Sequence, residues 1–283
     1  MNNRQIYRTK TVLQSANSPV NWANSPEALF PLLRASCYTV SAMIIPEIKK
    51  LNRKDIFRYL GLQSHSPGMD IREVEKLRLE AQIDRCEKLV LENARVRCVY
   101  QILPEEKIAA GFSSGADIPD DAVIVFEGRD IRKLLDGCTE AVLMALTLGS
   151  ELERILMQEE VRDMSDALVL DVCASAAVEE AADDFERKLS DLLRKEGRYL
   201  TNRYSPGYGD LPLSCQRPLL ELLNAQRAAG ITLTSSGLMV PRKSVTAIMG
   251  ISGNMKEKTL GGCGRCPLFS KCSYRSHGMR CYE

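Results

Sequence analysis

Two long stretches of regularly spaced apolar residues predict the main helices of this chain. Between 71 and 93, apolar residues recur at helical spacing among frequent charges, which is typical of an amphipathic helix. The segment 165–195 is longer, with a first half rich in alanine and an amphipathic second half. Small side chains let neighbouring elements approach closely, so we expect that first half at the centre of the fold. Shorter helices are predicted at 27–37, 53–61, 130–135, 150–159 and 218–225.

Strand-like patterns fall between these helices. Residues 95–103 alternate with a period near two, and residues 141–147 form a continuous apolar run, as expected of a buried strand. No regular alternation of strand and helix is present, so the prediction is an α+β fold with a mixed, largely antiparallel sheet and packed helices. Further strands are predicted at 122–126, 231–234 and 244–249.

Composition and charge are those of an ordinary globular protein. The chain has 283 residues, 45% hydrophobic and 27% charged, with 38 basic and 37 acidic side chains. This balance creates no field that would attract nucleic acid. The first residues lack the apolar run of a signal peptide, and no stretch approaches the length of a membrane span, so we expect a cytoplasmic protein. We expect three regions: an N-terminal arm and helix (1–45), an α+β domain (46–258) and a cysteine-rich tail (259–283).

The segment from Arg203 to Asp210 reads Arg-Tyr-Ser-Pro-Gly-Tyr-Gly-Asp and follows the long predicted helix. Pro206 fixes its own φ and Gly207 adopts backbone angles closed to other residues, so a rigid, open turn is expected. A guanidinium and two phenols beside it could hold a small zwitterion with an aromatic part. A well-made surface turn without a ligand is the alternative.

Asp171 and Glu179 lie in or beside the alanine-rich half of the long helix. They are either functional carboxylates or charges on the solvated side of that helix. The pattern leaves both interpretations open.

A family resemblance emerges from an ordered set of features. Residues 203–208 have the Arg-x-x-x-Gly-Tyr pattern of the activation domain of cobalamin-dependent methionine synthase. The hexamer alone would be a weak signal, but the features after it agree with that family in order. They are Leu219-Leu220-Glu221-Leu222-Leu223, Gly230-Ile231-Thr232-Leu233-Thr234, Met239-Val240-Pro241 and Ser244-Val245. The chain therefore resembles this family closely over about 165–250, and more loosely, through 55–61, back to about residue 50.

The resemblance implies a domain of a methyltransferase system that binds S-adenosylmethionine. Such a domain presents the methyl group to a cobalamin in the cob(II)alamin state, and one added electron completes the return to methylcobalamin. Arg203 would then hold the ligand's carboxylate. Tyr204, Ser205, Pro206 and Gly207 would meet the rest of the ligand, and Tyr208 would line the methyl-bearing pocket as a catalytic residue. The family also uses an early acidic residue for the ligand's amino group, and this sequence does not place its counterpart.

The chain differs from the family in architecture, because 283 residues cannot contain the homocysteine, folate and cobalamin domains. We therefore expect a free-standing activation protein that acts on a separate cobalamin-binding methionine synthase or a related corrinoid protein. An electron donor such as flavodoxin or ferredoxin would be a further partner. The alternatives are reactivation of a different corrinoid methyltransferase, or a metal-stabilised binding or scaffold module without turnover.

Four of the ten cysteines crowd into the tail: Cys263, Cys266, Cys272 and Cys281. Their spacing, C-x2-C-x5-C-x8-C among glycines, is typical of thiolate ligands for structural zinc or an iron–sulfur cluster. An iron–sulfur cluster would place an electron donor beside chemistry that needs an electron. A structural zinc site, with His277 as a replacement ligand, is the second interpretation. Free or redox-active thiols are the third. The remaining six are predicted to be buried free thiols: Cys37, Cys86, Cys98, Cys138, Cys173 and Cys215.

Overall fold

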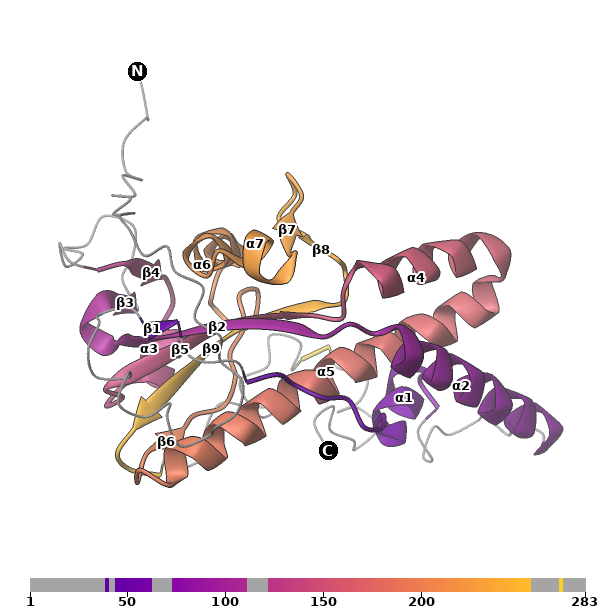
Figure 1. Ribbon diagram of the computed structural model, residues 1–283, viewed down its shortest axis with the longest axis horizontal. Coiled ribbons are helices and arrows are strands. Elements are labelled where there is room, and N and C mark those ends of the chain that lie inside the picture. Colours follow the sequence, from indigo (N-terminus) through magenta and orange to yellow (C-terminus); the bar gives the residue numbers. More distant parts are fainter. Residues whose placement is uncertain (1–38, 41–43, 63–72, 111–121, 256–269, 272–283) are drawn as a thin grey trace, which may run out of the picture. The chain divides into compact units, whose positions relative to one another are not determined.

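A five-stranded antiparallel sheet forms the middle layer of the fold (Figure 1). The structure is a computed structural model that describes residues 39–40, 44–62, 73–110, 122–255 and 270–271. Across the sheet the strands run in the order β1 (Thr39–Val40), β2 (Arg97–Pro104), β5 (Glu140–Thr147), β9 (Ser244–Ser252) and β6 (Tyr199–Leu200). The predicted α+β class with a largely antiparallel sheet is thereby confirmed.

The continuous apolar run of β5 is explained by burial on both faces of the sheet. Successive side chains of a strand point to opposite faces. Val142, Met144 and Leu146 accordingly join one hydrophobic cluster, whereas Leu143 and Ala145 join another. All five are fully buried, and the partly exposed position of this strand is Glu140 at its start, which pairs with Arg198.

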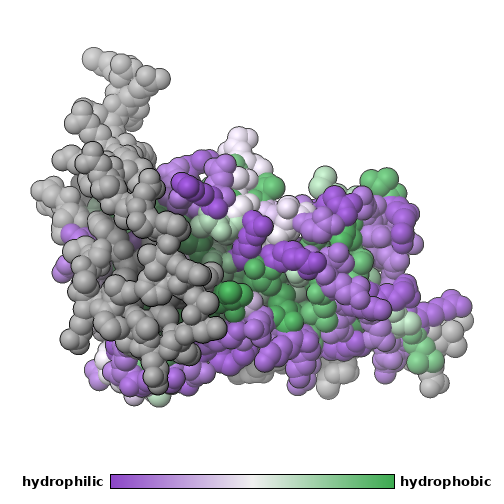
Figure 2. Space-filling view, in the orientation of Figure 1, coloured by the Kyte–Doolittle hydropathy of each residue, from purple (hydrophilic) through white to green (hydrophobic). Residues whose placement is uncertain are grey.

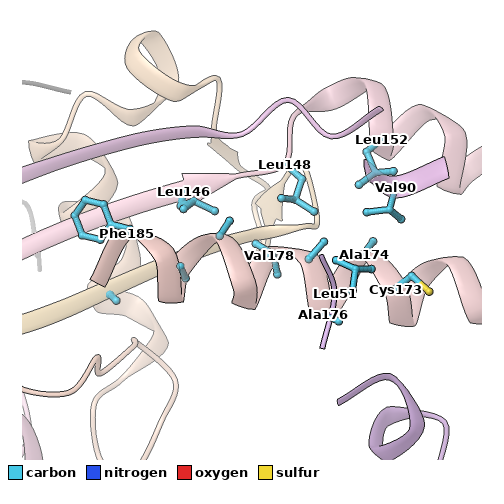
Figure 3. Close-up of a cluster of buried hydrophobic side chains, with 14 of the residues drawn as sticks. Leu51, Val90, Leu146, Leu148, Leu152, Cys173, Ala174, Ala176, Val178 and Phe185 are labelled. Atoms are coloured by element: carbon cyan, nitrogen blue, oxygen red, sulfur yellow. The ribbon is translucent and has the colours of Figure 1, made fainter. Parts of the chain in front are cut away.

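The long helix α5 (Met164–Arg194) lies along the first face of the sheet. Helices α1 (Arg53–Tyr59), α2 (Glu73–Asn93) and α4 (Ser150–Arg162) pack against α5 and share its hydrophobic cluster (Figure 1). As predicted, the alanine-rich half of α5 is central. Figure 3 shows Ala174, Ala176 and Val178 of α5 beneath Leu146 of β5 and Leu148, which directly follows that strand. Alanine at these positions lets the helix lie close to the sheet.

The second face is covered by α3 (Arg129–Leu135), α6 (Gln216–Leu222) and α7 (Ala225–Ala229). The helix predicted at 218–225 exists as α6 but ends at Leu222, because Asn224 adopts a left-handed φ of 48° and separates α6 from α7. Asparagine tolerates this conformation better than most residues, so it is a natural break point.

Two small strand pairs complete the described fold. A parallel pair joins β3 (Ile108–Ala110) to β4 (Ile124–Phe126), and an antiparallel pair joins β7 (Thr232–Leu233) to β8 (Met239–Val240). The strand predicted at 231–234 therefore exists as β7 but pairs outside the main sheet. Short strands β1, β3, β6 and β8 were not predicted, and the helix predicted at 27–37 lies outside the described residues.

A buried carboxylate fastens the segment before α1 to the long helix. Asp184 of α5, only 4% exposed, accepts the backbone N–H of Glu47 at 2.8 Å and pairs with Arg187 and Lys188. Lys188 also donates to the carbonyl of Ile45. These contacts hold α1 beside the middle of α5, next to the carboxylates described below.

Hydrophobic side chains reach the surface where α4 meets α5. Met157, Val161, Met164 and Leu168 are each more than half exposed. In Figure 2, hydrophobic residues appear among hydrophilic ones near the α4 end of the view. Within the part of the chain that the structure describes, no helix is long and apolar enough to cross a membrane.

The thiols of Cys86, Cys138, Cys173 and Cys215 are buried as predicted, and Cys98 is partly buried; Cys37 lies outside the described residues.

Candidate ligand site

The predicted turn begins at the edge of the main sheet, beside β9. Tyr204 forms an isolated antiparallel bridge to Ile248, with backbone hydrogen bonds of 2.9 and 2.8 Å in the two directions. Because neighbouring residues of an extended backbone point to opposite faces, Arg203 and Tyr204 are directed to different layers. Arg203 contacts α5 on one face, and Tyr204 packs against the hydrophobic cluster on the other.

Backbone hydrogen bonds hold the turn closed after Tyr204. The amide of Gly207 donates to the carbonyl of Leu211 at 2.9 Å, and the amide of Tyr208 donates to Ser205 at 3.2 Å. Gly207 has a φ of 92° and Gly209 a φ of 53°, conformations that favour glycine. The rigid turn predicted from this sequence is therefore present.

An interaction absent from the sequence prediction ties the turn to α3. The carboxylate of Asp210 accepts the backbone N–H groups of Arg129 and Asp130 at 2.7 and 3.0 Å. Gly128 occupies the N-cap position of α3 and has no side chain to do this. Burial pushes the pKa of Asp210 upward, but the amide hydrogen bonds outweigh burial and leave the pKa below its ordinary value.

The two tyrosines of the motif have different surroundings. The hydroxyl of Tyr204 donates to the carbonyl of Tyr208 at 3.0 Å and lies 3.4 Å from a carboxylate oxygen of Asp130. Burial, with Asp130 and Asp210 nearby, raises the pKa of Tyr204 to about 12, so this phenol stays protonated. The side chain of Tyr208 is 68% exposed. Tyr204 therefore braces the turn, whereas Tyr208 is available to a ligand or partner.

Arg203 lies against a row of carboxylates on α5. Its Nη2 donates to Asp183 at 2.6 Å and to Glu179 at 3.3 Å, and its Nε lies 3.6 Å from Glu186. Residues three and four apart share one face of a helix, which is why these three carboxylates meet one guanidinium. Nη1 is buried and has no hydrogen-bond partner among the described residues. That nitrogen has two N–H groups with which it could bind a further carboxylate.

Helix α1 adds charges to this cluster from the N-terminal part of the chain. Partial burial raises the pKa of Glu179; Arg203 lowers it, while Asp183 and Asp55 raise it further. Asp55 pairs with Arg58 at 2.7 Å, and the guanidinium of Arg58 lies 4.9 Å from the ring centre of Tyr59. Asp55 is thus an early acidic residue near the Arg203 cluster.

The two carboxylates that the sequence singled out have different partners. Glu179 contacts Arg203, whereas Asp171 pairs with Lys243 at 2.8 Å, further towards the start of α5. Asp183 and Glu186 were not predicted as site residues. Their helical spacing from Glu179 was the available signal, but only the fold reveals that this face of α5 meets Arg203.

The predicted metal ligands Cys263, Cys266, Cys272 and Cys281 lie outside the described residues. Over the ranges that the structure does describe, no group of three or more histidine, cysteine, aspartate or glutamate residues is arranged to hold a metal ion. The cysteine site therefore stays a prediction.

The α+β fold and this turn are features that comparison with known proteins can test. Residues 157–265 match the family model of the vitamin B12 dependent methionine synthase activation domain. The fold is similar to a crystal structure of the MetH reactivation domain bound to AdoHcy, with a TM-score of 0.50 and 16% identity over 85% of this chain and 90% of that chain. No curated protein matches the sequence. The family resemblance inferred from the sequence is confirmed by these matches.

Proposed function

We propose that the chain binds S-adenosylmethionine at the turn 203–208 and takes part in the reductive methylation of a cobalamin held by a methionine synthase or a related corrinoid protein. The observation that carries this proposal is the arrangement of Arg203. Its Nη1 has no partner among the described residues, in a turn that lies within the matched part of the chain. A carboxylate bound at Nη1 would gain charge-assisted hydrogen bonds while Nη2 keeps its contacts with α5.

The surrounding groups suit the other parts of the ligand. The carboxylates of α5 and Asp55 of α1 provide acceptors for an ammonium group, and we propose Asp55 as the early acidic residue of the site. Gly207 lets a ligand approach the backbone closely, and the exposed ring of Tyr208 can cover the methyl group. The backbone from Ser205 to Gly207 would meet the adenosyl part.

The chemistry requires one electron and one methyl group for each cobalamin. An external donor, of the flavodoxin or ferredoxin kind, would reduce cob(II)alamin. The methyl carbon–sulfur bond of S-adenosylmethionine then breaks with its electron pair on sulfur, giving S-adenosylhomocysteine, and the carbon–cobalt bond forms. The chain's own contribution would be to hold and orient the sulfonium, because the reacting cobalt belongs to the partner.

Calorimetry with S-adenosylmethionine tests the binding step. Folded protein that gives no heat of binding at tens of micromolar ligand, an affinity range ordinary for metabolite sites, would contradict the proposal. Reconstitution with candidate cobalamin proteins and a reductant then tests the function, since loss of cob(II)alamin absorbance should depend on both this chain and S-adenosylmethionine. A chain that binds the ligand but never accelerates that loss would be a binding module without turnover.

A further inference from the structure

A hollow of about 580 Å³ opens where the chain enters α1, beside α2 and α5 (Figure 1). Its lining comes from one short run of the chain and one residue of each neighbouring helix: Lys50, Leu51, Asn52, Arg53, Lys54, Glu87 and Glu180. The volume is within the range of small-molecule sites in proteins. The hollow is separate from the turn at 203–210.

The two acidic side chains of the hollow already face donors. Glu87 of α2 is only 15% exposed, and it accepts the backbone N–H of Leu51 at 3.3 Å and Nη2 of Arg53 at 2.7 Å. Glu180 of α5 lies 3.8 Å from the guanidinium of Arg187. A ligand entering the hollow therefore finds its main acceptors in use.

The donors of the hollow, in contrast, have spare capacity. Arg53 uses only Nη2, which contacts two carboxylates of α2, and its other nitrogens have no partner among the described residues. Asn52 accepts the backbone N–H of Lys54 through Oδ1 at 3.1 Å, which leaves its side-chain N–H groups available. The exposed ammonium groups of Lys50 and Lys54 have neither an ion pair nor a hydrogen bond within the described ranges.

The backbone that carries these donors is held in place on both sides. Leu51 is 4% exposed and belongs to the first hydrophobic cluster, and Asn52 caps α1. A few residues earlier, Asp184 holds the backbone of Glu47. Because this scaffold is ordered, gathering the donors around a ligand costs only the freedom of their side chains.

We propose that this hollow binds the phosphate group of a small phosphorylated metabolite. A phosphate is an anion with several strong acceptor oxygens, and it complements a site whose cationic donors are open and whose acceptors are occupied. Lysine is a common phosphate ligand, and the open nitrogens of Arg53 add a planar donor. The hollow is larger than one phosphate, so the ligand carries a further group. The inference does not depend on the proposed function.

Calorimetry at low salt with two probes tests the proposal. Inorganic pyrophosphate and ribose 5-phosphate both carry phosphate, and neither carries an adenine that could enter the proposed S-adenosylmethionine site. We expect at least one to bind with a dissociation constant below about 1 mM. Tighter binding of pyrophosphate would identify the further group as a second phosphate, and tighter binding of the sugar phosphate would identify it as a sugar. No heat from either probe at millimolar concentration would overturn the proposal.

Paired substitutions show whether the hollow is responsible. Lys50→Gln with Lys54→Gln should weaken the better probe about tenfold, since each exposed ion contact contributes a few-fold. Lys50→Arg with Lys54→Arg keeps both charges and should retain binding, which separates lost recognition from a folding defect. Lys133→Gln is the matched control, because it removes one exposed lysine charge from α3 in the other layer. Unchanged binding in the glutamine pair, or an equal loss in Lys133→Gln, would refute binding in this hollow.

Discussion

The carboxylate of Asp210 accepts the backbone N–H of Arg129 at 2.7 Å and so caps a helix that lies 81 residues earlier in the chain. One side chain thereby stabilises α3 and fixes the far end of the turn that begins at Arg203. Local order in the turn and stability of the second layer are coupled through this contact.

We expect Asp210→Ala to lower the free energy of unfolding by about 1 kcal/mol, the usual effect of losing an N-cap. It should also weaken S-adenosylmethionine binding, because the turn loses its attachment to α3. Thermal denaturation and calorimetry measure the two effects. Asp163→Ala is a suitable control, since Asp163 caps α5 through Ser165 and Asp166, far along the helix from Arg203. A variant of Asp210 that lost stability but bound ligand normally would show that the turn does not need this cap.

Replacing Arg203 by lysine should reduce S-adenosylmethionine affinity by roughly ten- to a hundredfold, the range for losing a charge-assisted hydrogen bond. Lysine keeps the positive charge that α5 requires but lacks the planar fork, so we expect a small change in thermal stability. Arg203→Ala should be less stable, because three neighbouring carboxylates would each lose their contact with this guanidinium. Lys243→Arg, at the other ion pair of this face of α5, should bind the ligand as the wild type does. Full affinity in the Arg203→Lys variant would argue against a forked contact.

A third prediction concerns Gly209, which combines a φ of 53° with close contact to the Tyr204 hydroxyl. A Cβ at this position would collide with that oxygen, so Gly209→Ala should cost about 1–3 kcal/mol. Adding Tyr204→Phe should recover part of the loss, since it removes the nearer of two colliding oxygens and leaves the carboxylate oxygen of Asp130, 2.8 Å from the added Cβ. Gly61→Ala measures the loss of stability that comes from the left-handed backbone alone. Gly61 has a φ of 72°, and an added Cβ there would meet nothing within 4 Å. If both glycine variants lost the same stability, the contact with Tyr204 would be unimportant.

The raised pKa of Glu179 predicts a pH dependence of stability. Since burial makes ionisation harder in the folded state, the folded protein holds this proton more tightly than the unfolded chain. The free energy of unfolding should therefore fall as pH rises from the pKa of Glu179 in the unfolded chain to its higher pKa in the folded protein. We expect Glu179→Gln to be more stable than the wild type near neutral pH, and to lose this advantage under acid conditions. Denaturation across the acid range measures the effect, and an advantage independent of pH would exclude Glu179 as its source.

The cysteine tail yields a prediction that depends on the sequence alone. Protein purified without oxygen should contain either stoichiometric zinc, or iron and sulfide with visible absorption. The double substitution Cys263→Ser and Cys266→Ser should abolish this metal binding. Cys98→Ser is the control, because burial raises the pKa of that thiol to about 12 and makes it a poor ligand. A colourless protein with stoichiometric zinc would remove the electron-donor interpretation. Metal-free protein would favour the third interpretation, free or redox-active thiols.

Much of the fold follows from periodicity, because long elements repeat their signal many times. The alanine-rich helix and the strand at 141–147 were predicted close to their observed bounds for this reason. Short elements carry too few residues for a period to be visible. Four strands of two or three residues, β1, β3, β6 and β8, were therefore missed, whereas β4 and β7 were predicted inside longer apolar runs. One left-handed residue, Asn224, was enough to end a helix before its predicted last residue.

Only part of the candidate site could be predicted from the sequence. The turn could be predicted because proline and glycine constrain the backbone wherever they occur. The partners of Arg203 could not, since Asp183 and Glu186 look like ordinary charges on an amphipathic helix until the fold places that face beside β9. Asp210 illustrates the same point, because its partners lie about eighty residues away in the chain.

The turn holds the two layers of the molecule together. Its first residue contacts α5 on one face of the sheet, and its last caps α3 on the other. Moving α5 or α3 away from the turn therefore breaks a polar contact of the same eight residues. A ligand seated there would raise the barrier to separating both layers at once, and would make the unfolding of the described domain more nearly all-or-none.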